Sequence, residues 1–197
     1  MDDDCYLATV PDLSRWCQDL PEDQDIAVVG FRYCNLPAGD LAPASSEPGE
    51  SSVILGGASL LRRSAMLQTG GYLDWLVFAA EDLELAMRLR RLGYRIWYDP
   101  SVIVQHARSH EGRDSEWGNF YYVRNTLVIN TIYGGWLTGV PLGLARALRR
   151  GWFHSDPCRR PWSAVWAGLC LYPRCWQVRR SLAGGIKTVT ATPKSDT

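Results

Sequence analysis

The sequence predicts an α/β protein in which a mixed sheet is flanked by helices. Short apolar runs with β-branched residues occur at 26–31 and 102–106, and both are typical of buried strands. The segment 81–92 carries apolar residues at helical spacing with arginines opposite them, and Gly93 follows as a cap. Because strand patterns alternate with helical patterns along the chain, a layered α/β domain is expected.

Length and charge limit the classes of partner. The chain has 197 residues, enough for one domain with a hydrophobic core. Its 21 lysines and arginines balance 21 aspartates and glutamates, so bulk charge gives no argument for nucleic acid, and no such partner is expected. The six cysteines show neither a CxxC pair nor zinc spacing, and the first residues lack a signal-peptide pattern. The cysteines are therefore expected to be reduced thiols in the cytoplasm.

The N-terminal half is predicted to alternate between strands and helices around one long loop. The stretch 36–52 is rich in Pro, Gly and Ser, which predicts a mobile loop. Pro11 lies near the first turn of a helical pattern, and Gly70-Gly71 ends another. The other elements expected here are a strand end at 1–6, a helix at 11–20, a strand at 53–58 and a helix at 64–70.

The C-terminal half is predicted to be mainly helical after two short strands, which Asp99-Pro100 separates. The elements expected are strands at 94–98 and 102–106, a polar loop at 109–117 and a helix at 119–133. The corresponding domains are an α/β part at 1–133, a basic, tryptophan-rich helical region at 134–187 and a disordered tail at 188–197.

Three aspartates at the start of the chain, Asp2, Asp3 and Asp4, form the first candidate for chemistry. Aspartates at positions i and i+2 of a strand end can both reach one hard cation that also holds two phosphates. A solvated acidic N-terminus is the simpler interpretation, and for three aspartates alone it is the favoured one.

A second candidate is Glu81-Asp82, at the start of the helix predicted at 81–92. Capping explains carboxylates there without any function, since the helix dipole and the free N–H groups favour them. A carboxylate held in such a place also stays ionised, which suits a general base facing a sugar hydroxyl.

Three weaker candidates each have a structural explanation. His106 ends an apolar run, where a lone histidine is more often structural than a ligand. Gly56-Gly57 lets backbone approach a ligand closely, but it also fits a plain turn. The segment 121–125, YYVRN, lies on a predicted helix and fits an amphipathic packing face equally well.

The order of these signals resembles the second half of family 2 glycosyltransferases with the GT-A fold. The separation between Asp82 and His106 fits that family, and YYVRN is similar to bacterial members that act on polymer or lipid-linked acceptors, including galactofuranosyl- and rhamnosyltransferases. The resemblance covers roughly residues 1–130. In chain order its signals are the aspartates at 2–4, GGA at 56–58, GGYLD at 70–74, ED at 81–82 with its helix, GY at 93–94 and the stretch from Pro100 to His106.

The resemblance implies a metal-dependent, inverting transfer from a nucleotide sugar to a glycan or polyprenyl-linked acceptor, as in cell-wall or polysaccharide biosynthesis. Asp2 and Asp4 would hold Mn²⁺ or Mg²⁺ with His106 completing the protein ligands, and the metal would neutralise the diphosphate leaving group. Asp82 would deprotonate the acceptor hydroxyl, with Glu81 supporting it.

The resemblance also implies a set of substrate-binding residues. Tyr72 and Trp75 would stack on the acceptor sugar, and Arg124 would bind a phosphate or carboxylate. Asp3 and the backbone at Gly56 and Gly57 would complete this set.

Members of the family carry about a hundred residues before the aspartates, as the strands and helices that bind the nucleoside. A chain truncated at its N-terminus is therefore expected, with no nucleoside pocket, with open sheet edges and with no saturable transfer of its own. The alternative is a non-catalytic remnant that binds a partner or a membrane. A metal-dependent hydrolase fits the spacing poorly.

Contact with a membrane is a further expectation. The stretch 126–145 is largely apolar, yet it holds Asn130, Pro141 and four glycines, which favours packed or interfacial structure over a spanning helix. The residues after it mix arginine with tryptophan, which suits peripheral attachment to an anionic membrane. Ordinary helices packed on the domain fit the same residues equally well.

Overall fold

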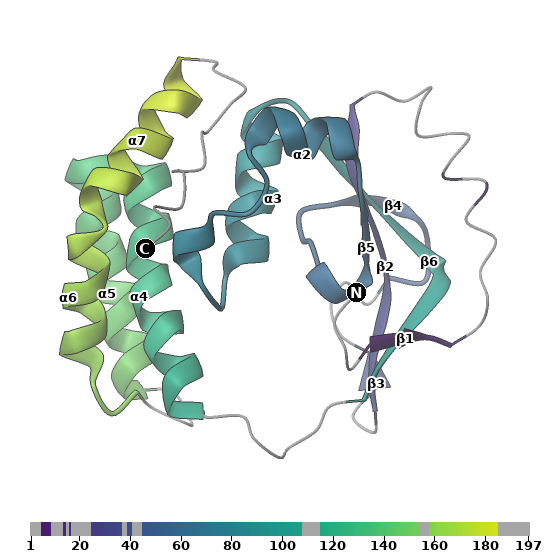
Figure 1. Cartoon of the computed structure of the whole chain (residues 1–197). Coiled ribbons are helices and arrows are strands. Elements are labelled where there is room, and N and C mark those ends of the chain that lie inside the picture. The colour runs from purple at the N-terminus through teal and green to yellow at the C-terminus, as the bar shows by residue number, and fades with distance from the viewer. Residues whose placement is uncertain are drawn as a thin grey trace, which may run out of the picture. The chain divides into compact units, whose positions relative to one another are not determined.

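The computed structural model describes residues 5–8, 14, 16, 25–36, 39–40, 45–107, 115–153 and 158–184. The chain divides into two compact units. The first consists of 1–71 and 85–111, and the second of 72–84 and 112–197. The expected mixed sheet with flanking helices is confirmed, with strands in the first unit and helices in both (Figure 1).

Two long strands form the centre of the sheet. β2 (Ile26–Leu36) and β6 (Arg95–Ala107) run parallel, and their buried residues include the apolar runs from which strands were predicted. Four short strands pair antiparallel with them, which makes the sheet mixed. β1 (Cys5–Leu7) and β4 (Gly49–Ser51) pair with β6, while β3 (Gly39–Asp40) and β5 (Ser59–Leu61) pair with β2.

The two strands predicted at 94–98 and 102–106 are one continuous strand, β6. Phe31 lies opposite Asp99 and Arg32 lies opposite Ile103, so β6 carries extra residues around Pro100. A bulge of this kind accommodates a proline, which cannot donate to the ladder of hydrogen bonds. Pro100 therefore bends the strand without ending it.

The region 36–58 also differs from its prediction. The expected loop contains β3 and β4, and the expected strand at 53–58 contains a short 3-10 helix, η1 (Gly56–Ala58), that leads into β5. The Ser59 hydroxyl donates to the Leu55 carbonyl over 2.8 Å and closes this turn. The short strands thus lie outside the two long strands, beside β2 and β6.

Helices cover one face of the sheet. α2 (Arg63–Thr69) ends at Gly70 in the left-handed region (φ 81°), and α3 (Glu81–Arg91) is followed by Gly93 (φ 88°), so both predicted helices and their glycine ends are confirmed. The buried Arg88 of α3 donates to the carbonyls of Thr69 and Gly71. The core on this face consists of Ala27, Val28, Ile54, Ala65, Leu85, Ala86, Leu89 and Ile96.

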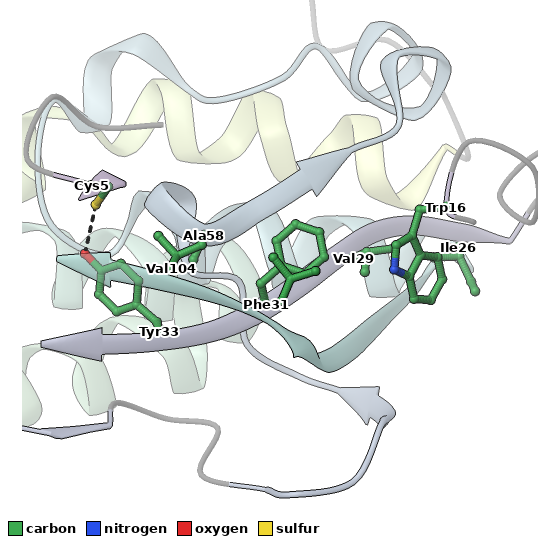
Figure 2. Packing of buried hydrophobic residues seen from close by; sticks show 9 residues of the cluster. Cys5, Trp16, Ile26, Val29, Phe31, Tyr33, Ala58 and Val104 are labelled. Carbon is green, nitrogen blue, oxygen red and sulfur yellow. Dashed lines mark hydrogen bonds between the residues drawn. The ribbon is translucent and has the colours of Figure 1, made fainter. Parts of the chain in front are cut away.

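The opposite face carries a second apolar cluster around β2 (Figure 2). Trp16, which lies within the helix predicted at 11–20, packs into this cluster and donates from Nε1 to Asp99 Oδ2 over 2.9 Å. The Cys5 sulfur lies 3.5 Å from the Tyr33 hydroxyl, a hydrogen bond drawn in Figure 2. Cys5 and Trp16 are thereby fixed to the sheet.

The second unit is a bundle built around α4 (Ser115–Gly134), which begins before the predicted helix at 119–133. A short π-helix, η3 (Gly135–Gly139), joins it to α5 (Val140–Phe153), and α6 (Pro161–Cys170) and α7 (Tyr172–Ala183) follow. The core of the bundle consists of Leu73, Leu76, Val123, Leu127, Val128, Ile132, Ala147, Cys158, Ala164, Val165, Cys175 and Val178.

Glycines let the helices approach α4 closely. A Cβ at Gly168 of α6 would lie 3.1 Å from the Arg124 carbonyl oxygen, and one at Gly143 of α5 would lie 2.8 Å from Asn130 Cβ. α4 packs on α5, α6 and α7 and belongs with them to the second compact unit. The predicted tail at 188–197 lies outside the described residues.

One helical run, Glu116–Trp152, is long and apolar enough to cross a membrane by length and composition alone. Of its most apolar window, 44% is buried inside the protein. A core helix of a soluble bundle meets the same criterion, so this run is weak support for a membrane span.

Candidate active site

A strained loop of the second unit carries Glu81 and Asp82 into the start of α3. It contains a 3-10 turn, η2 (Asp74–Leu76), followed by three non-glycine residues with positive φ: Val77 (63°), Ala79 (61°) and Ala80 (68°). Side chains rarely adopt this backbone region, and a β-branched valine there is an outlier. Such strain persists only where surrounding contacts enforce it, and it clusters at functional sites.

Two neighbouring side chains of α4, Arg124 and Asn125, hold this loop. The Nη2 atom of Arg124 donates to the carbonyls of Trp75 (3.0 Å) and Leu76 (2.5 Å). The amide nitrogen of Asn125 donates to the carbonyls of Leu76 (3.0 Å), Phe78 (2.7 Å) and Ala79 (2.6 Å). These contacts supply donors from α4 to backbone acceptors of the irregular loop, of which the Leu76 carbonyl also accepts from the Phe78 amide.

The same contacts compensate the burial of the Arg124 guanidinium. Burial lowers the pKa of Arg124 from its ordinary value, and Tyr121 opposes that shift. The guanidinium lies 4.4 Å from the centre of the Tyr121 ring, and its Nε donates to Asn125 Oδ1 over 2.8 Å. The sequence predicted Arg124 as a ligand for a phosphate or carboxylate, and in the structure its side chain donates to carbonyls of the loop and to Asn125.

Hydroxyl groups contact two carboxylates at the start of α3. The Tyr72 hydroxyl donates to Asp82 Oδ1 over 2.8 Å, at an exposed position. The Tyr133 hydroxyl of α4 lies 3.0 Å from Glu84 Oε1 and 3.1 Å from the Glu84 carbonyl, and Glu84 is fully buried. Glu84 thus ties the first turn of α3 to α4, while Asp82 remains half-exposed.

The two aromatic residues predicted to stack on the acceptor differ in their surroundings. Tyr72 is 39% exposed, so its ring is accessible to a ligand. Trp75 is partly buried against the core of the bundle, and Glu81 is half-buried. Accessibility to a sugar is therefore greater at Tyr72 than at Trp75.

His106 lies in the first unit, near the end of β6. It pairs with Cys5 across the antiparallel β1–β6 ladder, and its ring stacks on Tyr33 with centroids 5.2 Å apart. Its residue exposure is 7%. Asp2, Asp3 and Asp4 lie outside the described residues, although Asp4 directly precedes Cys5 in the sequence.

Among the described residues, no group of three His, Cys, Asp or Glu side chains is placed to hold a metal ion. The metal ligands predicted from the sequence include Asp2 and Asp4, which lie outside the described residues. Gly56 and Gly57 form the 3-10 turn η1 of the first unit, with Gly57 buried. His106 belongs to the first unit and Asp82 to the second.

Sequence reasoning missed Asn125, Glu84 and Tyr133 as residues that shape the site. The YYVRN segment pointed to the right part of α4, but its asparagine was not assigned a role. A polar pair followed by an apolar run of the same helix is the signal that identifies it, because polar groups buried in a core require partners. The partners here are loop carbonyls 46–49 residues earlier in the chain.

Comparison with known proteins shows similarity to a glycosyltransferase. A stretch of 71 residues is 39% identical to N-acetylglucosaminyl-diphospho-decaprenol L-rhamnosyltransferase of Mycobacterium tuberculosis. The identity and the matched length are the same for this protein in two strains of that organism. The match covers 34% of this chain and 23% of the relative, so the chain matches less than a quarter of the length of these relatives. No family model matches the chain. The mixed sheet with its helices is compatible with part of a nucleotide-sugar transferase fold.

Proposed function

We propose that this chain forms the metal- and acceptor-binding part of an inverting glycosyltransferase. The observation that carries the proposal is its 39% identity over 71 residues to a rhamnosyltransferase whose name specifies a polyprenyl-diphosphate-linked acceptor. The donor would be a nucleoside-diphosphate sugar, and the acceptor a glycan or a polyprenyl-linked saccharide. Cell-wall or polysaccharide biosynthesis is the process such a reaction serves.

Asp82 is the base in this proposal. Its carboxylate already accepts a hydrogen bond from one hydroxyl group, that of Tyr72, at 2.8 Å. An acceptor hydroxyl at a similar distance would lose its proton to Asp82 as its oxygen forms a bond to the anomeric carbon. The bond to the nucleoside diphosphate breaks on the opposite face of the sugar, so the anomeric configuration inverts.

The Arg124–Asn125 pair supports this role by fixing the loop that leads to Asp82. General-base catalysis depends on placing the carboxylate within hydrogen-bond reach of the hydroxyl. The loop would otherwise relax, since three residues before Glu81 have costly positive φ angles. We therefore assign Arg124 as a positioning residue of the acceptor site.

Asp2, Asp4 and His106 would hold Mn²⁺ or Mg²⁺. Carboxylate oxygens suit both cations and imidazole suits transition metals, so the donor set is appropriate, above all for Mn²⁺. The pairing of Cys5 with His106 supports the grouping, because Asp4 is the residue before Cys5. When bound, the metal would neutralise charge on the diphosphate leaving group. Asp3 and the turn at Gly56-Gly57 stay proposed contacts of the substrate.

Glycosyl transfer tests this proposal directly. Residues 1–197, and the same chain extended by any in-frame upstream coding sequence, would be incubated with Mn²⁺, labelled nucleoside-diphosphate sugars and N-acetylglucosaminyl-diphospho-polyprenol. We expect labelled lipid-linked product from the extended chain, loss of product with Asp82→Asn, and unchanged product with Asp25→Asn, an exposed turn residue. Equal activity of Asp82→Asn and the unmodified chain would refute the assignment of the base.

A further inference from the structure

Helix α6 presents apolar side chains on its exposed face as well as on its buried one. Pro161–Cys170 contains no charged residue. Ala164, Val165 and Gly168 face the core of the bundle. Trp162, Trp166 and Leu169 follow the i, i+4, i+7 spacing of a single helical face and are exposed, the two tryptophans by 59% and 69%. A helix that is apolar all round is normally covered on all sides.

The exposed face continues onto α5. The rings of Trp152 and Trp162 meet edge-on with centroids 5.3 Å apart, and Trp152 is itself exposed. Trp152, Trp162, Trp166 and Leu169 are called the tryptophan ridge below. The ridge runs along α6, whose ten residues span about 15 Å.

The charge around the ridge is mainly positive, and Glu116 of α4 is an acidic residue beside it: it accepts from the Arg159 amide over 3.0 Å and lies 3.8 Å from Arg160 Nε. From 140 to 184 the sequence carries eight arginines and one acidic residue, Asp156, which lies outside the described residues. Arg159 and Arg160 directly precede α6 and are exposed. Exposed arginines also occur on α5 and α7, at Arg146, Arg149, Arg174 and Arg180.

We propose that the tryptophan ridge docks on the surface of an anionic lipid bilayer. Tryptophan favours the level of the lipid headgroups, where its ring is buried while its N–H stays solvated. Arginines beside such a helix are attracted to anionic lipids, which add binding free energy for each charge near the surface. A helix bound in this way lies in the plane of the interface.

The charge distribution favours lipid over a second copy of the chain. Two copies facing each other through this ridge would bring arginines of like charge together, which opposes association. A bilayer containing anionic lipid complements both the apolar ridge and its positive surroundings. Under the proposed function, the same contact would hold the acceptor-binding unit at the surface where a polyprenyl-linked acceptor resides, although the lipid contact itself does not depend on that function.

Vesicle co-sedimentation tests the ridge. The chain would be mixed with vesicles of phosphatidylcholine alone or of phosphatidylcholine with phosphatidylglycerol. We expect at least about tenfold stronger binding to the anionic vesicles, falling with added salt. Trp162→Ser with Trp166→Ser should weaken that binding at least about tenfold, since two interfacial anchors are removed. Leu67→Ser, which changes an exposed apolar residue of the first unit, should leave it unchanged.

Two further measurements make the result decisive. Circular dichroism of each variant checks folding, and Arg159→Gln with Arg160→Gln should reduce the preference for anionic lipid while leaving the tryptophans intact. Binding of the folded double tryptophan variant as strong as that of the unmodified chain would overturn the proposal. So would absence of binding to anionic vesicles at low salt, or self-association in sedimentation velocity that the tryptophan substitutions abolish. Neither donor nor acceptor is present, so failure here leaves the proposed transfer reaction untouched.

Discussion

The Tyr72 hydroxyl donates a hydrogen bond to Asp82 Oδ1 over 2.8 Å, and the two residues lie ten positions apart on either side of a strained turn. Tyr72 begins the loop of the second unit and Asp82 lies in the first turn of α3. The contact therefore closes the loop at its ends, while Arg124 and Asn125 hold its middle. An acceptor hydroxyl approaching Asp82 would share the carboxylate with Tyr72 or displace it.

Replacing Tyr72 by phenylalanine separates the two roles proposed for this side chain. Tyr72→Phe keeps an aromatic ring for stacking on a sugar but removes the hydroxyl that orients Asp82. One hydrogen bond contributes about 0.5–1.5 kcal/mol, so kcat should fall by up to about tenfold with little change in the KM of the acceptor. Steady-state kinetics in a transfer-competent form would show this. A rise in acceptor KM at constant kcat would instead indicate a role in binding alone.

Replacing Asp82 by asparagine should have a much larger effect. If Asp82 accepts the proton in the transition state, Asp82→Asn should lower kcat by about 10²- to 10⁴-fold. The affinity for the donor, measured by calorimetry with a nucleoside diphosphate and Mn²⁺, should stay nearly the same because the base acts only during transfer. A variant that mainly loses donor affinity would show that Asp82 belongs to the donor site.

The sequence was sufficient to predict the elements with strong periodicity. The runs at 26–31 and 102–106 lie in β2 and β6, and the leucine pattern at 81–92 forms α3. The short strands β3 and β4 were missed because two or three polar or glycine residues carry no periodic signal. The continuity of β6 through Pro100 was missed because it depends on a bulge opposite β2, which is a property of the pair of strands.

The site was predictable to a similar extent. The place of Asp82 in the first turn of a helix follows from local sequence, because carboxylates favour helix N-termini. The partners of Arg124 do not follow from local sequence, since its carbonyl acceptors lie 48 and 49 residues away in the chain. An arginine side chain can bind a phosphate or a carboxylate and can also donate to backbone carbonyls, so local sequence does not name its partners.

Removal of the Asn125 side chain should release the loop. Asn125→Ala deprives the buried carbonyl of Ala79 of the Asn125 amide, and an unsatisfied buried acceptor costs about 1–3 kcal/mol, whereas the Leu76 carbonyl keeps Arg124 and the Phe78 amide as donors. The free energy of unfolding of the second unit should fall by that amount, and hydrogen exchange should accelerate at the amides of Val77 and Phe78. Asn130→Ala is the matched control on α4, since the Asn130 side chain donates to Thr126 of its own helix and accepts from Arg146 of α5.

For that experiment the contrast between the two variants is the deciding result. Equal exchange rates at Val77 and Phe78 in Asn125→Ala and in the unmodified chain would show that the loop holds its conformation without Asn125. Equal acceleration in Asn130→Ala would show a general loosening of α4. Arg124→Lys should give an intermediate effect, because lysine retains the charge but cannot place two donors in one plane.

Substitution of His106 tests the proposed metal site. His106→Ala should weaken Mn²⁺ binding by about 10-fold or more in the presence of a nucleoside diphosphate, because one of three protein ligands is lost. Calorimetry measures this, with thermal unfolding as a check that loss of the stacking contact with Tyr33 has not unfolded the sheet. Asp2→Asn with Asp4→Asn should weaken binding likewise. Mn²⁺ affinity that none of these substitutions changes would exclude this ligand set.

Thiol reactivity should separate two cysteines that lie five residues apart on consecutive helices. Cys170 is exposed at the end of α6, whereas Cys175 is buried in the core of the bundle. Burial raises the pKa of the Cys175 thiol from 9.0 to about 12, with a backbone hydrogen bond opposing the shift. The thiolate is the reactive form, so iodoacetamide at pH 8 should modify Cys170 readily and leave Cys175 unmodified in the folded protein.

The same shift predicts how stability depends on pH. The folded state keeps the Cys175 proton at pH values where the unfolded state has released it, so this group stabilises the fold fully below about pH 9 and progressively less as the pH rises towards 12. Cys175→Ser should reduce that alkaline sensitivity, although it also costs stability by placing a hydroxyl in an apolar cluster. Peptide mapping by mass spectrometry after alkylation checks the reactivities, and denaturant unfolding at pH 8 and pH 10 checks the stability. Rapid alkylation of Cys175 in the folded chain at pH 8 would show that α7 separates from α4 far more often than their packed core implies.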